Sequence, residues 1–394
     1  MEEILIVSNY YPPEKGAAPN RIEQLALKLN QNNFKVSVVC PLANYPKGEI
    51  FPAYKNKFSV KETLDGIPVS RLWIYPSNSK NFAKRILSIL SFSVGLFFFL
   101  LFKKIPKKVI VQSPPLLLSF ISVLALSIRG RKIILNVSDL WPMAATELSV
   151  LKVDSFSHKM LLFLEKFIYR KATLVLGQSN EIIQHVQSIY PKKQCYLYRN
   201  FPDHKHEFIE NPLSENHKVK LFYAGLLGVA QGVLEVCEKM NLENLNIECH
   251  IFGDGAEKSA IETYIKNHPE KNIVFHGMLE RNDLISRLAS FDIALVPLKT
   301  RIYGSVPSKI FEYTALGIPV LYFGGGEGET IVNENDLGWV ANVGHFDELN
   351  QVLFQISAME RATLQNMKKS VWETSGKNFN LDYQMAGLID KKVF

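Results

Sequence analysis

Segments of strand length that alternate with helical segments constrain this fold more than any other feature of the sequence. In the first half, residues 4–8 and 35–40 are short and apolar, and residues 20–30 between them have the composition of a helix. A strand-helix-strand order favours parallel strands with helices on the faces of the sheet. Further strands of this sheet are expected at residues 108–112, 132–137 and 173–176.

The same alternation restarts after a polar segment. Residues 201–217 contain two prolines and show no hydrophobic periodicity, so we expect an interdomain linker there. A chain of 394 residues is also too long for one ordinary hydrophobic core. Strands of a second sheet are expected at residues 219–224, 247–252, 273–276, 293–296 and 320–323.

These patterns predict an α/β fold of two doubly wound, Rossmann-like domains, each built on a parallel sheet. The first domain is expected over residues 1–200 and the second over residues 218–372, and residues 373–394 are expected to cross back to the first. Sheets of this kind bind ligands at the carboxyl ends of their strands, so a cleft between the domains is the expected site.

Composition excludes several other classes of protein. Hydrophobic residues make up 47% of the chain and charged residues 21%, which is typical of globular domains. The four cysteines are widely spaced and form no Cys-x-x-Cys pair, so we expect neither a zinc site nor a disulfide framework. The start of the chain has no signal-peptide pattern, and a cytoplasmic protein is expected.

The positive charge of the chain is concentrated in one region. The net charge is +7, yet no Asp or Glu occurs between Asp65 and Asp139. That region contains eleven basic residues, namely Arg71, Lys80, Lys84, Arg85, Lys103, Lys104, Lys107, Lys108, Arg129, Arg131 and Lys132.

An apolar run, residues 86–102, lies inside this basic region. Lys84 and Arg85 precede it, and Lys103, Lys104, Lys107 and Lys108 follow it. Basic residues around an apolar helix are typical of binding to an anionic leaflet, whereas a nucleic-acid surface would interleave its charges with polar and aromatic residues. We therefore favour an interfacial helix on the inner face of the membrane. A buried core helix and, because 17 residues are short for a crossing, a true span are the alternatives.

The segment Gly304 to Glu327 has the properties of an anion-binding turn. Pro307 and Ser308 suit a helix start, Gly317 suits its end, and residues 309–316 are expected to be helical. A helix start of this kind offers free backbone N–H groups to a diphosphate. Lys309 can add a positive charge, and Glu312 can accept hydrogen bonds from ribose hydroxyls. The alternative is that Glu312 only stabilises the helix start and that Lys309 is solvated.

This segment resembles the end of the Glu-x7-Glu motif of retaining glycosyltransferases with the GT-B fold, the large family numbered four. Glu312 matches the second Glu, which the resemblance assigns to the donor ribose. Other matching segments are Pro12-Pro13 with Gly16-Ala17-Ala18, Asp139-Leu140-Trp141-Pro142, Tyr223-Ala224-Gly225 through Gln231-Gly232, Gly253-Asp254-Gly255, and Phe275-His276-Gly277.

Several polar residues of the family pattern are replaced in this chain. The first Glu of the pair is Gly304, the Arg and Lys of the phosphate loop are Leu226 and Gln231, and the His before Asp139 is Ser138. A subgroup that makes bacterial O-antigen and capsule repeat units, including N-acetylfucosamine transferases, is similar at these positions. Lys309 and Arg301 are our expected replacements for the missing phosphate cations.

The resemblance implies a set of site residues and partners. Asp139, Gly16 and Glu312 are expected to be catalytic. Donor binding is assigned to Gly225, Gln231, Gly253, Gly277, Arg301, Ser308, Lys309 and Glu312, and the acceptor or membrane side to Asn20 and Arg21 with the basic residues around the apolar run. A turn role is the alternative for Asp139.

The expected reaction transfers a sugar from a UDP-sugar, with retention, to a saccharide linked to undecaprenyl diphosphate. No cofactor is expected, and because the chain has no Asp-x-Asp triplet, no metal is expected either. Two other functions stay open: a nucleotide-sugar epimerase on the same fold, and a non-catalytic subunit that binds sugar nucleotides.

Overall fold

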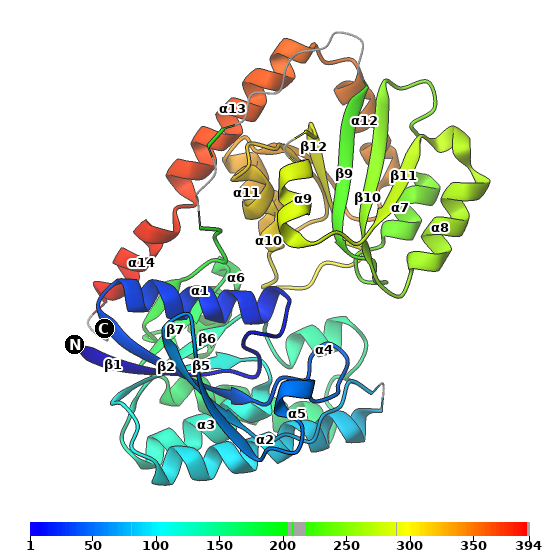
Figure 1. Cartoon of the computed structure of the whole chain (residues 1–394). Coiled ribbons are helices and arrows are strands. Elements are labelled where there is room, and N and C mark those ends of the chain that lie inside the picture. Colours follow the sequence, from blue (N-terminus) through cyan, green and yellow to red (C-terminus); the bar gives the residue numbers. More distant parts are fainter. Residues whose placement is uncertain (80, 204–206, 209–217, 289, 392–394) are drawn as a thin grey trace. The chain divides into compact units, whose positions relative to one another are not determined.

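The computed structural model divides the chain into two compact units (Figure 1). Unit 1 comprises Met1–Arg199, Ile302–Ser305 and Asp382–Phe394, and unit 2 comprises Asn200–Arg301 and Val306–Leu381. The structure describes residues 1–79, 81–203, 207–208, 218–288 and 290–391. Most of the expected linker, residues 201–217, and Lys80 of the basic region therefore lie outside the described residues.

Unit 1 is built on a sheet of eight strands in the order β3-β4-β2-β1-β5-β6-β7-β8. All neighbours are parallel except β3 and β4, which form an antiparallel hairpin at one edge. The strands are Glu2–Val7 (β1), Phe34–Pro41 (β2), Ser59–Leu64 (β3), Ile67–Leu72 (β4), Lys108–Ser113 (β5), Lys132–Val137 (β6), Leu174–Gly177 (β7) and Cys195–Leu197 (β8).

Helices cover both faces of this sheet, which confirms the doubly wound prediction. One face packs against α1 (Ala17–Gln31) and α14 (Leu381–Ile389). The other packs against α2 (Phe82–Phe102), α3 (Leu116–Ile128), α5 (Phe156–Lys171) and α6 (Asn180–Ile189). The short helix α4 (Met143–Glu147) follows β6, and a single 3-10 turn, η1, spans Pro52–Tyr54.

Unit 2 is built on a parallel sheet of six strands in the order β11-β10-β9-β12-β13-β14. The chain builds from β9 toward β11 and then returns to the other side of β9, so the point where the strand order reverses lies between β9 and β12. The strands are Val219–Leu226 (β9), Ile247–Asp254 (β10), Ile273–Gly277 (β11), Ile293–Pro297 (β12), Val320–Phe323 (β13) and Gly338–Ala341 (β14).

The second sheet is also covered on both faces. Buried side chains of α7 (Val233–Lys239), α8 (Lys258–Asn267) and α12 (Phe346–Ser357) form one core. Those of α9 (Arg281–Leu288), α10 (Ser308–Thr314) and α11 (Glu327–Glu334) form the other, and α13 (Arg361–Asn378) contributes to both. A 3-10 turn, η2, spans Pro269–Lys271.

Candidate functional site

The loops after β9 and β12 form the candidate donor site of unit 2. Ligands of open α/β sheets bind where the strand order reverses, just beyond the carboxyl ends of the strands. The two loops meet there, since Lys299 N donates to Ala230 O at 3.1 Å and the side chain of Lys299 lies against Gly232. The predicted residues Gln231, Arg301, Ser308, Lys309 and Glu312 belong to these loops or to α10, which follows them, and Gly225 lies near the end of β9 itself.

Lys309 is a half-buried cation directly over the end of β9. A Cβ at Gly225 would overlap Lys309 Nζ, and the ammonium lies 5.6 Å from the centre of the Tyr223 ring. Burial lowers the pKa of Lys309, and the charge of Glu312 opposes that shift. Within the part of the chain that the structure describes, no carboxylate lies within ion-pair distance of this ammonium. A charge held this way is well suited to an anionic ligand.

Glu312 lies one turn after the start of α10. Its Oε1 accepts a hydrogen bond from Ser308 Oγ at 2.9 Å, and the side chain is exposed. The helix comprises Ser308–Thr314. It begins one residue before the expected range of 309–316 and ends two residues before the end of that range. Since α10 has only seven residues, we give its macrodipole little weight beside the charge of Lys309.

The other predicted donor residues surround this point from neighbouring strands. Gly253 pairs with Gly225 across β10 and β9, and a Cβ at Gly253 would overlap the carbonyl oxygen of Gly225, so the two strand ends meet without side chains. Gln231 Oε1 is buried without a hydrogen-bond partner among the described residues. Arg301 extends toward Gly326, the N-cap residue directly before α11.

The end of β11 adds an aromatic surface beside Gly277. His276 stacks on Phe252 with ring centres 4.4 Å apart, and its Nε2 lies 2.8 Å from Nδ1 of His250. Burial lowers the pKa of both imidazoles, which favours their neutral forms. The resemblance places the segment Phe275-His276-Gly277 beside the base, but neither His250 nor His276 was named as a site residue. Phe252 is buried and holds the half-exposed ring of His276 flat, and the outer face of that ring suits an aromatic base.

In unit 1, Asp139 lies at the end of a buried polar network. Arg21 Nη1 donates to Gln178 Oε1 at 2.5 Å and Nη2 donates to Asn136 Oδ1 at 2.9 Å. Ser138 Oγ lies 3.3 Å from Asp139 Oδ2. Burial raises the pKa of Asp139, and the positive charge of Arg21 opposes this shift.

This network corrects the assignment of Arg21 to the acceptor side. Arg21 is 5% exposed and all its described hydrogen bonds are to other parts of unit 1, so it is not available to a soluble ligand. Asn136 and Gln178 were not predicted. The available signal was an amide side chain inside an apolar strand for Asn136, or directly after one for Gln178, since such a group must find a hydrogen-bond partner when buried.

The loop between β1 and α1 is held by buried charges. Glu14 accepts backbone N–H groups from Tyr11, Asn44 and Tyr45, at 3.2, 2.9 and 2.9 Å. Arg71 donates to the carbonyl oxygen of Pro12, so it belongs to the interior of unit 1 and not to a basic surface. The loop ends at Gly16, which caps α1 with a φ of 141°, and Asn20 follows in the first turn of that helix.

Gly304, which replaces the first Glu of the family pair, lies in the unit 1 part of the chain. Its N–H donates to Glu181 Oε2 at 2.6 Å, and its carbonyl accepts from Ser179 Oγ at 2.8 Å. A Cβ there would lie 3.0 Å from the side chain of Ile182 and 3.1 Å from that of Leu140. With a φ of +84° as well, this position does not accommodate a Glu.

The basic residues around the apolar run differ in their exposure to solvent. Lys84, Arg85, Lys103, Lys104 and Lys107 are exposed, as predicted for a basic surface. Lys108 is not: it is the first residue of β5, it is 8% exposed, and it pairs with Glu2. Its assignment to a membrane surface is therefore wrong.

Helix α2 is longer than the apolar run and is partly buried. Residues Ala83–Phe102 are long and apolar enough to cross a membrane by length and composition, and 28% of the apolar window is buried. Phe92, Leu96 and Leu100 are fully buried in the core of unit 1. Because α2 packs on the sheet between β4 and β5, we interpret it as part of the domain and not as a span.

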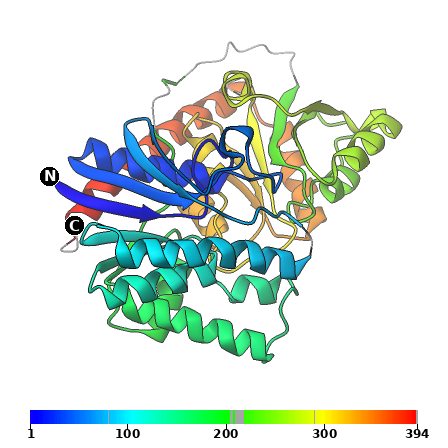
Figure 2. The same cartoon turned by 60° about the horizontal axis from the view of Figure 1, so that its bottom comes forward.

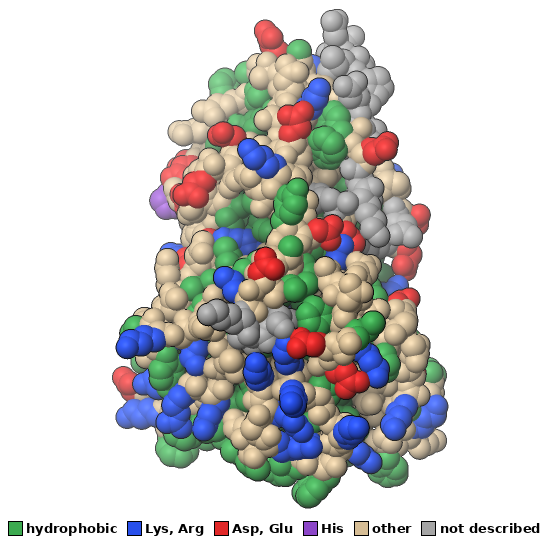
Figure 3. Space-filling model, turned by 90° about the vertical axis from the view of Figure 1, so that its left-hand side faces the viewer, with side chains coloured by type: hydrophobic (Ala, Val, Ile, Leu, Met, Phe, Trp, Pro, Cys, Tyr) green, Lys and Arg blue, Asp and Glu red, His purple; other side chains and the backbone are tan. Residues whose placement is uncertain are grey.

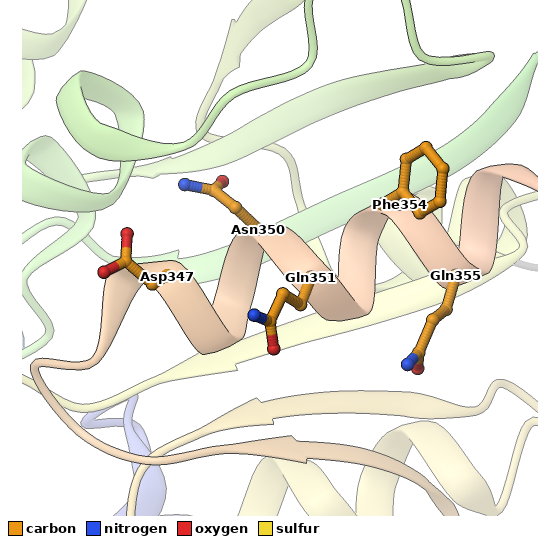
Figure 4. A pocket seen from close by; sticks show the side chains of 5 residues that line it. All are labelled: Asp347, Asn350, Gln351, Phe354 and Gln355. Atoms are coloured by element: carbon orange, nitrogen blue, oxygen red, sulfur yellow. The ribbon is translucent and has the colours of Figure 1, made fainter.

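A separate hollow lies along α12 (Figure 4). Asp347, Asn350, Gln351, Phe354 and Gln355, all from this one helix, line it. These residues provide no cation, and Asp347 would repel a diphosphate, so we do not regard the hollow as the donor site.

Comparison with known proteins supports the fold and the donor domain. Residues 218–358 match the family described as glycosyl transferases group 1. Over 391 residues the chain is 25% identical to the probable glycosyltransferase WbjE of Pseudomonas aeruginosa, covering 94% of this chain and 93% of that protein.

Solved structures with the GT-B fold match nearly the whole chain. Sucrose-phosphate synthase from Thermosynechococcus elongatus has a TM-score of 0.72 at 14% identity and covers 99% of this chain and 98% of its own. Anabaena HepE in complex with UDP has a TM-score of 0.69 at 14% identity and covers 99% of both chains. These likenesses establish the GT-B fold for this chain.

Proposed function

We propose that this chain, a group 1 glycosyltransferase with the GT-B fold, transfers a sugar with retention from a UDP-sugar to a lipid-linked saccharide. The observation that carries the donor part is the half-buried ammonium of Lys309, held over the glycine end of β9 without a carboxylate partner among the described residues. HepE, which shares the fold, was solved with UDP bound, and this supports a uridine donor.

The chemistry follows from the leaving group. When the bond from the anomeric carbon to the diphosphate breaks, negative charge builds up on the diphosphate oxygens, and a fixed cation stabilises it. Lys309 has this role in our proposal, with Arg301 as the second cation. Glu312 holds the ribose hydroxyls, so that the donor is oriented before reaction.

We assign Asp139 to the acceptor or the transferred sugar. Its carboxylate is half-buried at the carboxyl end of β6, next to the backbone loop that leads into α4. A partly desolvated carboxylate with a raised pKa is a suitable acceptor for a proton from a hydroxyl group. Gly16, in the loop held by Glu14 and Arg71, leaves room for the sugar beside it.

The acceptor is proposed to be bound to the inner leaflet of the cell membrane through undecaprenyl diphosphate. The support is the exposed basic group at the ends of α2, namely Lys84, Arg85, Lys103, Lys104 and Lys107. Each such charge contributes about 1 kcal/mol near an anionic surface. The resemblance to O-antigen and capsule transferases supports a role in surface polysaccharide synthesis, with an N-acetylated amino deoxysugar as the proposed donor sugar.

One experiment tests the activity directly. The purified chain is incubated with a panel of UDP-sugars and a lipid-linked saccharide, and products are identified by mass spectrometry. We expect one donor to extend the acceptor by one sugar, with slow release of UDP when the acceptor is left out. Interconversion of UDP-sugars without transfer would instead identify an epimerase, and binding with no UDP release would identify a non-catalytic subunit.

A further inference from the structure

A second apolar surface of unit 1 is formed by residues 148–163, called here the α4–α5 segment. It joins α4 to α5 and includes the first half of α5. Six large hydrophobic side chains along it are exposed: Leu148 by 44%, Val150 by 71%, Val153 by 58%, Phe156 by 84%, Met160 by 47% and Phe163 by 63%. Single exposed hydrophobic residues are ordinary, but a continuous series marks an interaction surface.

The core of unit 1 does not account for these side chains. Phe156, Met160 and Phe163 are four and then three residues apart, so they lie along one side of α5. The opposite side provides Ile168 and Tyr169 to the core, where both are buried. The helix therefore has one apolar face packed in the domain and a second apolar face directed to the outside.

The exposed charges of the helices on this side of the sheet are positive, and the α4–α5 segment itself adds one exposed lysine, Lys152, and one exposed carboxylate, Asp154. Helices α2, α3 and α5 lie side by side on one face of the sheet of unit 1 (Figure 2). The sequences of α2 and α3 contain no Asp or Glu. Glu165, the carboxylate of α5, is 1% exposed and lies 2.8 Å from His185 Nε2. The exposed charges of α2 and α5 are Lys84, Arg85, Lys159, Lys166, Arg170 and Lys171.

Helix α2 has a matching exposed apolar stripe on the same layer. Leu87, Val94, Phe98 and Phe102 are 51 to 77% exposed, and they recur at helical spacing. In Figure 3, Lys and Arg side chains gather near hydrophobic side chains at the lower end of the view, where Figure 1 places α2 and α3. Two apolar stripes on helices whose exposed charges are all basic complement an anionic lipid surface.

We propose that the α4–α5 segment is a membrane-insertion element. Phe156, Met160 and Phe163 enter the boundary between headgroups and acyl chains, and Lys159 and Lys166 contact anionic headgroups. Lipid binding by this element can be tested without any assumption about catalysis. The link to catalysis rests on the proposed function: only α4 separates Asp139 from Leu148, so an element anchored here would hold the candidate catalytic carboxylate close to lipid-linked acceptors.

The test measures partition of the full chain into liposomes of phosphatidylglycerol and phosphatidylcholine by flotation. A large apolar side chain that leaves a lipid interface loses most of its transfer free energy, so Phe156→Ser should lower the partition coefficient by about tenfold. The triple variant Phe156→Ser, Met160→Ser, Phe163→Ser should lower it by about a hundredfold or more. The loss should persist at high salt, because it removes apolar contacts.

A matched control comes from the same unit. Phe58 is 82% exposed, but it lies before β3 at the far edge of the sheet. Phe58→Ser should leave liposome binding unchanged. The proposal is overturned if the triple variant binds liposomes as the wild type does, if Phe58→Ser loses as much, or if the triple variant instead converts an oligomer into a monomer. The proposed function is tested separately, by the affinity for UDP and by the rate of sugar transfer to a soluble acceptor. Both should be the same in the triple variant as in the wild type.

Discussion

Lys309 Nζ occupies the space where a side chain at position 225 would begin. The two residues are distant in sequence, but the end of β9 and the start of α10 meet there. A glycine at position 225 therefore permits both the lysine and the approach of a ligand to the backbone.

Replacing Lys309 by Met should separate phosphate binding from folding. The variant keeps an apolar stem and removes a partly desolvated charge that has no carboxylate partner among the described residues, so the free energy of unfolding should stay the same or rise. The affinity for UDP should fall by about 1.5 to 3 kcal/mol, while the affinity for uridine should not change.

Calorimetry with both ligands checks this prediction. The control variant is Lys266→Met, which removes an exposed lysine and should leave the UDP affinity of the protein unchanged. Adding a cation through Gln231→Lys should partly restore UDP binding to the Lys309 variant. Equal losses of UDP and uridine affinity would mean that Lys309 only packs.

Glu312→Gln should affect both ligands instead. The carboxylate is exposed and its described hydrogen bond comes from Ser308, so the fold should not change. If it accepts from the ribose hydroxyls, UDP and uridine should each lose about 1.5 to 3 kcal/mol of binding free energy. Ser308→Ala is the control for a disturbed helix start. Unchanged uridine binding in the Glu312 variant would exclude the ribose role.

The pH dependence of turnover should report the pair Asp139 and Arg21. Burial raises the pKa of Asp139, so activity that needs the carboxylate should be lost on acidification at a higher pH than for an ordinary Asp. Arg21 opposes this shift, so Arg21→Met should move the acid limb to higher pH still. Arg21→Lys keeps the charge and should move it less.

The readout is the pH profile of kcat with a soluble acceptor. Asp139→Asn should lower kcat strongly and leave UDP binding unchanged, because the donor residues belong to unit 2. If kcat falls at the same acidic pH in the wild type and in Arg21→Met, then the charge of Arg21 does not affect the ionisation of Asp139.

Restoring the family's carboxylate by Gly304→Glu should destabilise the protein and not improve it. The positive φ costs about 1 to 2 kcal/mol, and crowding against Leu140 and Ile182 costs about 1 to 3 kcal/mol more. Gly344→Glu is a matched control, since its φ is +80° but nothing lies within 4 Å of its Cβ. Urea unfolding should show the larger loss for Gly304→Glu, and equal losses would mean that only the backbone matters.

Charge reversal at the end of α2 tests the electrostatic part of membrane binding. A variant in which Glu replaces Lys103, Lys104 and Lys107 should no longer bind anionic liposomes. Its affinity for UDP should be unchanged. Lys108→Glu is excluded from this set, because Lys108 is buried at the start of β5 and a Glu there would face Glu2 and destabilise unit 1. Wild-type binding that does not weaken with salt would contradict the prediction.

The sequence predicted most of both sheets because buried parallel strands are continuous apolar runs. The bounds of β6 and β13 agree with the expected 132–137 and 320–323. The hairpin of β3 and β4 was missed, although its turn, Asp65-Gly66, is a strong hairpin signal and both residues have positive φ. Its strands are half exposed, so they lack the apolar runs used to find the others.

Some residues of the candidate site were predicted correctly and others were not, and the difference has a physical reason. Residues on a local motif, such as Ser308 and Glu312, are placed by helical spacing alone. Arg21 and Lys108 were misjudged because the burial of a charged residue depends on partners far away in sequence, here Gln178 and Asn136 in one case and Glu2 in the other. No local pattern reports such a partner.

The position of α14 in unit 1 has a consequence for how the chain is made. Met385 and Leu388, near the end of the chain, are fully buried in the core that also contains β1 and α1. During synthesis the chain emerges from its N-terminus, and domains generally fold as units. Unit 2 is complete when residue 381 has left the ribosome, whereas unit 1 must wait for α14. The first unit to begin translation is therefore the last to complete its core.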